Sequence, residues 1–224
     1  HRGEERGGEH GQDGVAVPRG PAADLVFVEA GFGLGDGEGF LDAPAAAGDL
    51  DPTFGSGGKA LTSFAVSVVT EASAVAIQPD GKIVLAGGVE FPTAGDFDFG
   101  AARLNADGSL DTTFDTDGRQ TVAFDLGGSK EDKANAVVIQ PDGKIVLGGS
   151  AATTASADDF ALARLKTDGS LDATFDTDGR QTVNFGNNDI VHALALRPDG
   201  RIVAAGEWSG GAPDFAVAQF TPAG

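Results

Sequence analysis

The sequence of 224 residues contains no cysteine, no methionine and no tyrosine, and only one tryptophan. Without cysteine there are no disulfides, thiolate zinc sites or cysteine nucleophiles. Because there is no methionine, we expect the sequence to be a processed product or part of a longer protein. No stretch approaches the roughly 18 apolar residues that a membrane-spanning helix needs. The compartment must therefore be inferred from other features.

Basic residues are also scarce. Fifteen Lys and Arg stand against 34 Asp and Glu, which gives a formal net charge of −19. Such a surface repels nucleic acid and anionic membranes, and it favours cationic partners, divalent ions or simple solubility. We therefore expect no nucleic-acid partner and no membrane span.

Glycine is abundant, with 35 residues, and 41% of the chain is hydrophobic. Many tight turns between short apolar runs favour an all-β fold. Internal repetition defines that fold further. Gly48–Phe54 recurs as Gly108–Phe114 and as Gly169–Phe175, so that Leu50, Leu110 and Leu171 are spaced by 60 and 61 residues.

Two further blocks follow each copy in the same order. The first contains a Pro-Asp-Gly turn and spans 74–84, 136–146 and 193–203, and the second spans 98–104, 159–165 and 214–220. Proline presets φ, aspartate bonds the backbone and glycine takes positive φ, so Pro-Asp-Gly predicts a hairpin turn.

The middle copy predicts four strands, at 119–124, 134–140, 144–150 and 159–165. Apolar residues occupy both alternating faces of 136–139 and 145–147, which indicates strands buried on both sides. We therefore predict an all-β protein of repeated four-stranded antiparallel blades, β-propeller-like, either partial or completed by oligomerisation or a partner. A β-sandwich or an open β-solenoid is the alternative.

The predicted strands at 59–64 and 214–220 lie at the two ends of the repeated region, and pairing them would close a ring and remove both edges. Three blades are fewer than the four to eight that typically close. A degenerate N-terminal blade, a second copy or a further segment is therefore expected to complete the ring.

The sequence predicts two regions, a polar Gly-rich arm at 1–47 and three β-repeats at 48–224. Within the arm, residues 24–30 form one possible degenerate strand. Docking on a partner is one role for this arm, and an inert linker is the alternative.

The blocks at 110–118, 140–149 and 159–165 resemble the delta-60 repeat family, and the resemblance extends from Gly48 to the C-terminus. The sequence departs from the family pattern at Gln219 and Phe220, where Arg-Leu is expected. The resemblance implies a bacterial protein that is exported to the periplasm, the cell surface or the medium, with a propeller-like fold and no transferable catalytic residues.

Carboxylates in two turns form a candidate calcium site, because Ca²⁺ takes six to eight oxygen ligands. The residues are Asp111, Asp115, Asp117, Asp172, Asp176 and Asp178. An EF-hand loop is absent and the first copy has glycines at two of these positions, so a plain acidic turn is the alternative. Apart from this possible calcium ion, no cofactor is expected.

Catalytic residues are not evident. His192 occupies a position that is Asn135 and Ser73 in the other copies, which favours a polar residue at a strand edge over a catalytic base. Phe54, Phe114 and Phe175 are predicted to fill the core between blades. The sequence thus favours a non-catalytic exported structural or interaction module that docks on a larger protein assembly, with a protein partner or self-association. A calcium- or carbohydrate-binding module and a carbohydrate-active enzyme are the alternatives.

Overall fold

The computed structural model describes residues 47–64, 69–92, 96–127, 131–153 and 157–224. The predicted strand at 24–30 and nearly all of the predicted arm lie outside these ranges. Residues 43–224 form one compact unit. Within the described residues every regular element is a strand. No described helix is long and apolar enough to cross a membrane.

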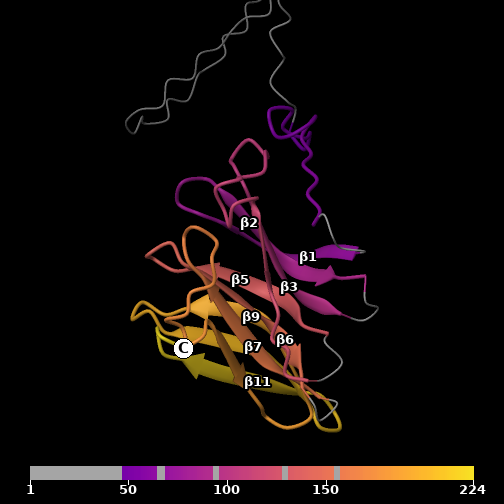
Figure 1. The fold of residues 1–224 in the computed structure, drawn as a ribbon, viewed down its shortest axis with the longest axis vertical. Coiled ribbons are helices and arrows are strands. Elements are labelled where there is room, and N and C mark those ends of the chain that lie inside the picture. Colours follow the sequence, from indigo (N-terminus) through magenta and orange to yellow (C-terminus); the bar gives the residue numbers. More distant parts are fainter. Residues whose placement is uncertain (1–46, 65–68, 93–95, 128–130, 154–156) are drawn as a thin grey trace, which may run out of the picture. The chain divides into compact units, whose positions relative to one another are not determined.

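In the described part of the chain, eleven strands form three antiparallel sheets (Figure 1). The first sheet contains β1 (Val69–Ile77), β2 (Ile83–Glu90), β3 (Phe97–Leu104) and β4 (Arg119–Val122). The second contains β5 (Lys133–Ile139), β6 (Ile145–Ala152), β7 (Asp158–Leu165) and β8 (Arg180–Val183). The third contains three strands among the described residues, β9 (Asn188–Leu196), β10 (Ile202–Ser209) and β11 (Asp214–Phe220).

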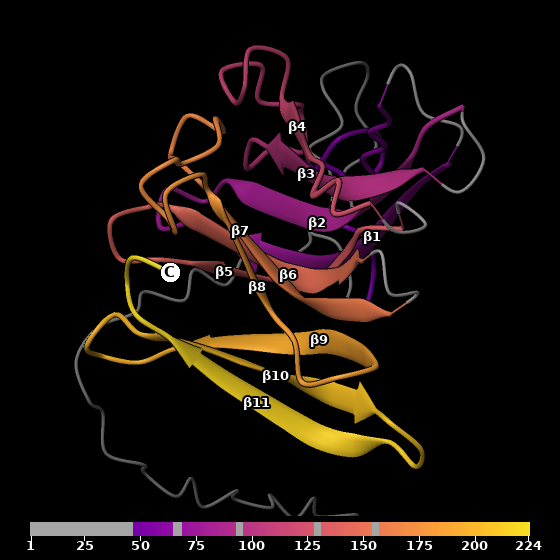
Figure 2. The ribbon, with the colours of Figure 1, turned by 60° about the horizontal axis from the view of Figure 1, so that its bottom comes forward.

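The sheets follow one another face to face, with the second between the first and the third (Figure 2). The first strand of each sheet contacts the first strand of the next, since β5 contacts both β1 and β9. This is the arrangement of consecutive propeller blades, and the prediction of an all-β, propeller-like repeat fold is confirmed.

The sheet boundary differs from the sequence repeat by one strand. The strand that begins at Arg119 does not start the second sheet but completes the first, where Ala102 pairs with Arg119 and Phe99 pairs with Val122. In the same way Ala163 pairs with Arg180 and closes the second sheet. Each blade is therefore finished by the segment that opens the next sequence repeat.

The prediction of a corresponding strand at 59–64 is wrong for the described residues. Lys59 makes one isolated bridge to Gly55, and residues 60–64 form no strand. Regular strand structure needs a neighbouring strand to satisfy its backbone N–H and C=O groups. The described residues provide none beside this segment.

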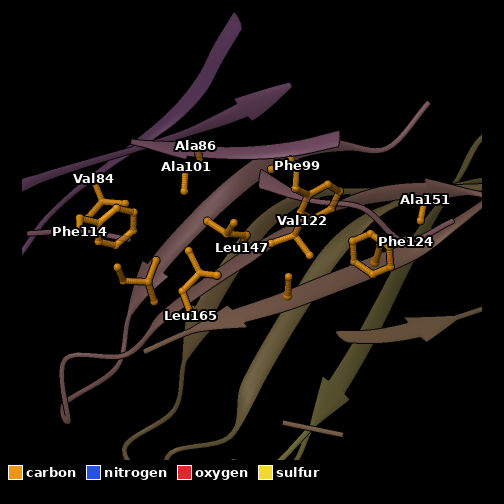
Figure 3. Close-up of a cluster of buried hydrophobic side chains, with 14 residues drawn as sticks. Val84, Ala86, Phe99, Ala101, Phe114, Val122, Phe124, Leu147, Ala151 and Leu165 are labelled. Atoms are coloured by element: carbon orange, nitrogen blue, oxygen red, sulfur yellow. The ribbon is translucent and has the colours of Figure 1, made fainter. Parts of the chain in front are cut away.

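The middle sheet is buried on both faces, as predicted, and all eight residues of β6 are buried. Between the first and second sheets lies a core that includes Val84, Phe99, Leu147 and Leu165. Figure 3 shows Phe114 and Phe124 at opposite ends of this core. A second core between the second and third sheets includes Val146, Phe160, Leu162, Phe175 and Ile202.

A glycine in each sheet permits a β-bulge in the first strand. Gly87, Gly149 and Gly206 stand opposite the bulges, and a Cβ on any of them would lie within 2 Å of a backbone oxygen of the neighbouring strand. No side chain fits at that distance. One glycine of each Gly-Gly pair in the first two sheets thus has a specific role in strand pairing.

Candidate functional site

A buried ion pair recurs in the two complete sheets. Nε of Arg103 donates to Oδ2 of Asp111 at 2.7 Å, and Nζ of Lys82 lies 2.8 Å from the same oxygen. In the second sheet Arg164, Asp172 and Lys144 make the equivalent contacts at 2.8 and 3.0 Å. We call each set an arginine clamp, because it ties the end of one strand to the segment that completes the sheet.

The clamp also reaches the next sheet. Nη1 of Arg103 donates to the carbonyl oxygen of Thr167 at 2.6 Å, and its guanidinium carbon lies 4.7 Å from the centroid of the Phe114 ring. Arg164 repeats both contacts, with the carbonyl of Pro222 and the ring of Phe175. Phe114 and Phe175 are fully buried, which confirms their predicted place in the core, whereas Phe54 is half-buried.

These contacts set the ionisation of the two carboxylates. Burial alone would raise the pKa of Asp111, but hydrogen bonds from Lys82, Thr113 and Arg103 hold the pKa well below its ordinary value. The pKa of Asp172 is lowered against the same desolvation by Thr174, Lys144 and Arg164. Both aspartates are therefore charged members of the packing between blades.

Sequence reasoning missed the clamp. Each arginine binds the aspartate eight residues further along the chain, beyond the end of its own strand. The available signal was the recurrence of the Arg and of the Leu-Asp pair in the same order.

The other four aspartates of the predicted calcium site lie in the two acidic turns. Asp115 and Asp176 have positive φ, of 42° and 41°, and the equivalent residue in the first copy is Gly55 at 57°. Glycine and aspartate both tolerate this left-handed conformation, which explains why they interchange at this position. Asp117 and Asp178 accept hydrogen bonds at 2.9 Å from the backbone N–H groups two residues on.

The acidic turns do not gather the six predicted ligands into one site. Among the described residues no group of three or more His, Asp or Glu side chains is placed to hold a metal ion. Desolvation, with Asp117 and Asp168 nearby, raises the pKa of Asp115. Calcium binding therefore stays a prediction, and Asp111 and Asp172 have another role in the arginine clamps.

The backbone of the acidic turns also joins the sheets. The N–H groups of Asp115 and Asp176 donate to the carbonyls of Asp168 and Ala223 at 2.7 and 2.8 Å. The N–H of Gly55 donates to Asp107 in the same way, at 2.7 Å. The segment that contains Gly55 thus holds the position, relative to the first sheet, that the end of a preceding blade would hold.

The third sheet has an incomplete clamp. Gln219 stands in place of the arginine, and Arg201 stands in place of Lys82 and Lys144. Arg201 is exposed and turns back to Asp199 of its own turn, at 3.0 Å. The matching aspartate of the first copy, Asp51, is also exposed, and its carboxylate accepts hydrogen bonds only from Thr53 among the described residues.

The outer edge of the third sheet exposes apolar side chains. In the described residues β11 pairs with β10 alone. Phe215 is 101% exposed, although its equivalents Phe99 and Phe160 are fully buried. Val217 is 60% exposed, and the equivalent Leu162 is fully buried.

The outer face of the first sheet is apolar too. Val75 and Ile77 are 61% and 71% exposed, and their equivalents Val137 and Ile139 pack against the core between the first and second sheets. A groove of about 200 Å³ lies on this face, lined by residues that include Leu61, Phe64, Leu85 and Leu104. The two end sheets therefore present the same kinds of surface that the middle sheet buries.

The fold and these surfaces define the class of protein: an all-β repeat protein with propeller-type blades, open at its third sheet in the described residues. Residues 78–114, 140–175 and 197–224 match a family described as "Domain of unknown function (DUF5122) beta-propeller". Each matched segment starts at a Pro-Asp-Gly turn, and the first two end at Phe114 and Phe175. No curated protein matches the chain.

Proposed function

We propose that the protein is a non-catalytic, exported interaction module that binds protein through the incomplete ends of its blade stack. The observation that carries the proposal is the outer edge of β11, where Phe215 is fully exposed at a position buried in both other sheets. Docking there would form a β-strand pair and bury apolar surface together.

The composition of β11 supports this role. Soluble proteins usually protect an edge strand with lysine, proline, a bulge or a covering segment. Residues 215–220 contain neither lysine nor proline, and the pairing of β11 with β10 is regular throughout. An edge of this kind is typical of a surface that another strand covers.

The absence of catalysis and the location outside the cytoplasm belong to the same proposal. In the described part of the chain His192 is the one histidine, and its side chain is exposed. Resemblance to bacterial exported repeat proteins and a formal charge of −19 support export. Fractionation of the producing cells tests the location, and recovery in the cytoplasm alone would contradict it.

Site-specific photocrosslinking in the producing cells tests binding. A benzophenone amino acid at position 215 is expected to crosslink a protein, and the same group at position 142, in an exposed turn of the middle repeat, is not. The Val217→Asp change should abolish the crosslink from position 215, because it places a charge on the edge strand. Equal crosslinking from positions 215 and 142, or none from either, would overturn the proposal.

A further inference from the structure

Three segments of the chain carry the same sequence pattern, but only two of them complete a sheet. The segment 110–124 supplies β4 to the first sheet, and the segment 171–185 supplies β8 to the second. The segment 50–64 supplies a strand to no described sheet. Among the described sheets, the third is the one without a fourth strand.

The segment 50–64 is nevertheless placed as a blade end. Its Gly55 makes the same backbone hydrogen bond to the next sheet as Asp115 and Asp176 make. The ring of Phe54 packs at Gly108 as the ring of Phe114 packs at Gly169. The backbone edge of this segment that does not face the first sheet is therefore oriented toward the place where the first three strands of a preceding blade would lie.

We propose that this place is taken by the third sheet of a second copy of the chain, so that residues 59–62 of one copy pair with β11 of the other. The inference rests on the proposed function and names its partner. The pairing in the complete sheets gives the register. Ala60 pairs with Val217, and Thr62 pairs with Phe215.

Charge complementarity supports a second copy. In both complete sheets the aspartate of the Leu-Asp pair meets an arginine and the lysine of the Pro-Asp-Gly turn. In the composite sheet Asp51 meets Gln219 and Arg201. Among the described clamp residues, Asp51 is the acid without a basic partner, and Arg201 is the cation that pairs within its own turn. The second copy brings these two residues together.

The apolar faces match as well. In the core between the first and second sheets, Phe99 and Ala101 lie on one side, and Val137 and Ile139 pack against them from the other. In the composite interface the equivalent residues are Phe215 and Val217 on one copy and Val75 and Ile77 on the other. All four are exposed in the single chain, and association buries them in a single core.

Two copies supply six sheets, which lies within the four to eight that form closed propellers. A head-to-tail interface closes into a ring when its rotation permits, and here two identical junctions close the ring. The expected assembly is a dimer in which neither β11 edge is exposed.

Charge reversal at the two ends tests the proposal. Asp51→Arg sets arginine against Arg201 in a self-dimer, and Arg201→Asp sets aspartate against Asp51. Each variant alone is expected to dimerise at least about 30-fold more weakly than the unchanged chain, since like charges meet at both junctions. An equimolar mixture should restore dimers, because each junction then joins opposite charges. Sedimentation velocity at about 0.15 M salt measures the distribution, under screening that limits general repulsion between acidic chains.

Matched controls reverse an acidic and a basic residue at sites away from the proposed junction. Asp168→Arg disrupts a turn in which Asp168 binds Ser170 as Asp51 binds Thr53, and Lys166→Asp reverses an exposed cation of the middle repeat. Both controls should dimerise like the unchanged chain. Equal weakening by the controls, or no recovery in the mixture, would overturn the proposed junction.

Engineered cysteines detect even weak association, because a disulfide traps the associated pair. The chain has no cysteine of its own, so the disulfide is specific to the engineered positions. A mixture of Ala60→Cys and Val217→Cys should give a covalent dimer on mild oxidation, and a mixture of Ala60→Cys and Asp142→Cys should not. A chain that stays monomeric and gives no selective disulfide overturns the second copy as partner. If position 215 still crosslinks another protein in cells, the proposed function stands although the partner is not a second copy.

Discussion

The second and third sheets contain the same repeated sequence but differ on the side where a following blade would lie. Phe160 in the second sheet is fully buried, and the equivalent Phe215 in the third is fully exposed. Arg164 binds Asp172, and the equivalent Gln219 has no aspartate from a following segment among the described residues. The comparison shows that a blade here is finished by the residues that follow it, so a missing segment leaves both a strand edge and a broken clamp.

The largest difference between the two sheets should come from their equivalent phenylalanines. Phe160→Ala is expected to lower the free energy of unfolding by about 4 kcal/mol, because a fully buried ring leaves a cavity. Phe215→Ala should change it by less than about 0.5 kcal/mol when the chain is monomeric. Urea unfolding at low protein concentration measures both, and similar losses would show that Phe215 is covered within one chain.

The clamp should show the next largest difference. Arg164→Leu leaves the buried Asp172 with Lys144 as its one charged partner and is expected to cost about 3 kcal/mol. Gln219→Leu, at the equivalent position, should cost less than about 0.5 kcal/mol. The same denaturant series serves, and a small effect of Arg164→Leu would contradict the role given to the arginine clamp.

Two glycine substitutions distinguish the loss of a contact between blades from a change in loop flexibility. Gly169 has a φ of 90°, and a Cβ there would lie 2.7 Å from the backbone nitrogen of Asp115 and from the Phe114 ring. Gly169→Ala should cost about 2 kcal/mol. Gly211→Ala, where no atom lies within 4 Å, should have almost no effect. Thermal unfolding of the two variants checks the difference, and equal midpoints would contradict it.

The smallest expected effect is a pH dependence. The folded state holds the pKa of Asp172 below its unfolded value, so its stabilisation is complete above the unfolded pKa of about 4 and is lost as pH falls below it. Between pH 7 and pH 3 the unchanged chain should lose about 1 kcal/mol more than Asp172→Asn. Desolvation raises the pKa of Asp132, so Asp132→Asn should shift the acid dependence with the opposite sign. Equal pH profiles would contradict the ionised clamp.

The repeats, the hairpins and the double-sided burial of β6 could all be predicted from sequence, because short periodic patterns and Pro-Asp-Gly turns depend on neighbouring residues. The sheet to which Arg119–Val122 belongs could not, since periodicity does not show which neighbour a strand joins. The strand expected at 59–64 failed for the same reason, as β structure depends on a partner strand.

The candidate site was predictable in part. The sequence indicated that Phe114 and Phe175 fill the core and that three blades are too few to close a ring. It did not show that Asp111 and Asp172 bind arginines, because the partners meet only when the completing segment returns to the strand end. Local spacing suggested metal ligands, whereas three-dimensional pairing gives the two aspartates a different role.

Hydrogen–deuterium exchange of β11 and β7 as a function of protein concentration tests the central claim most directly. The amides of residues 158–165 should be protected at every concentration, because β7 lies between two strands. Those of residues 214–220 should exchange faster at low concentration and become protected as dimers form. Protection of β11 equal to that of β7 at the lowest concentration, or no change with concentration, would contradict a blade that is completed by a second copy.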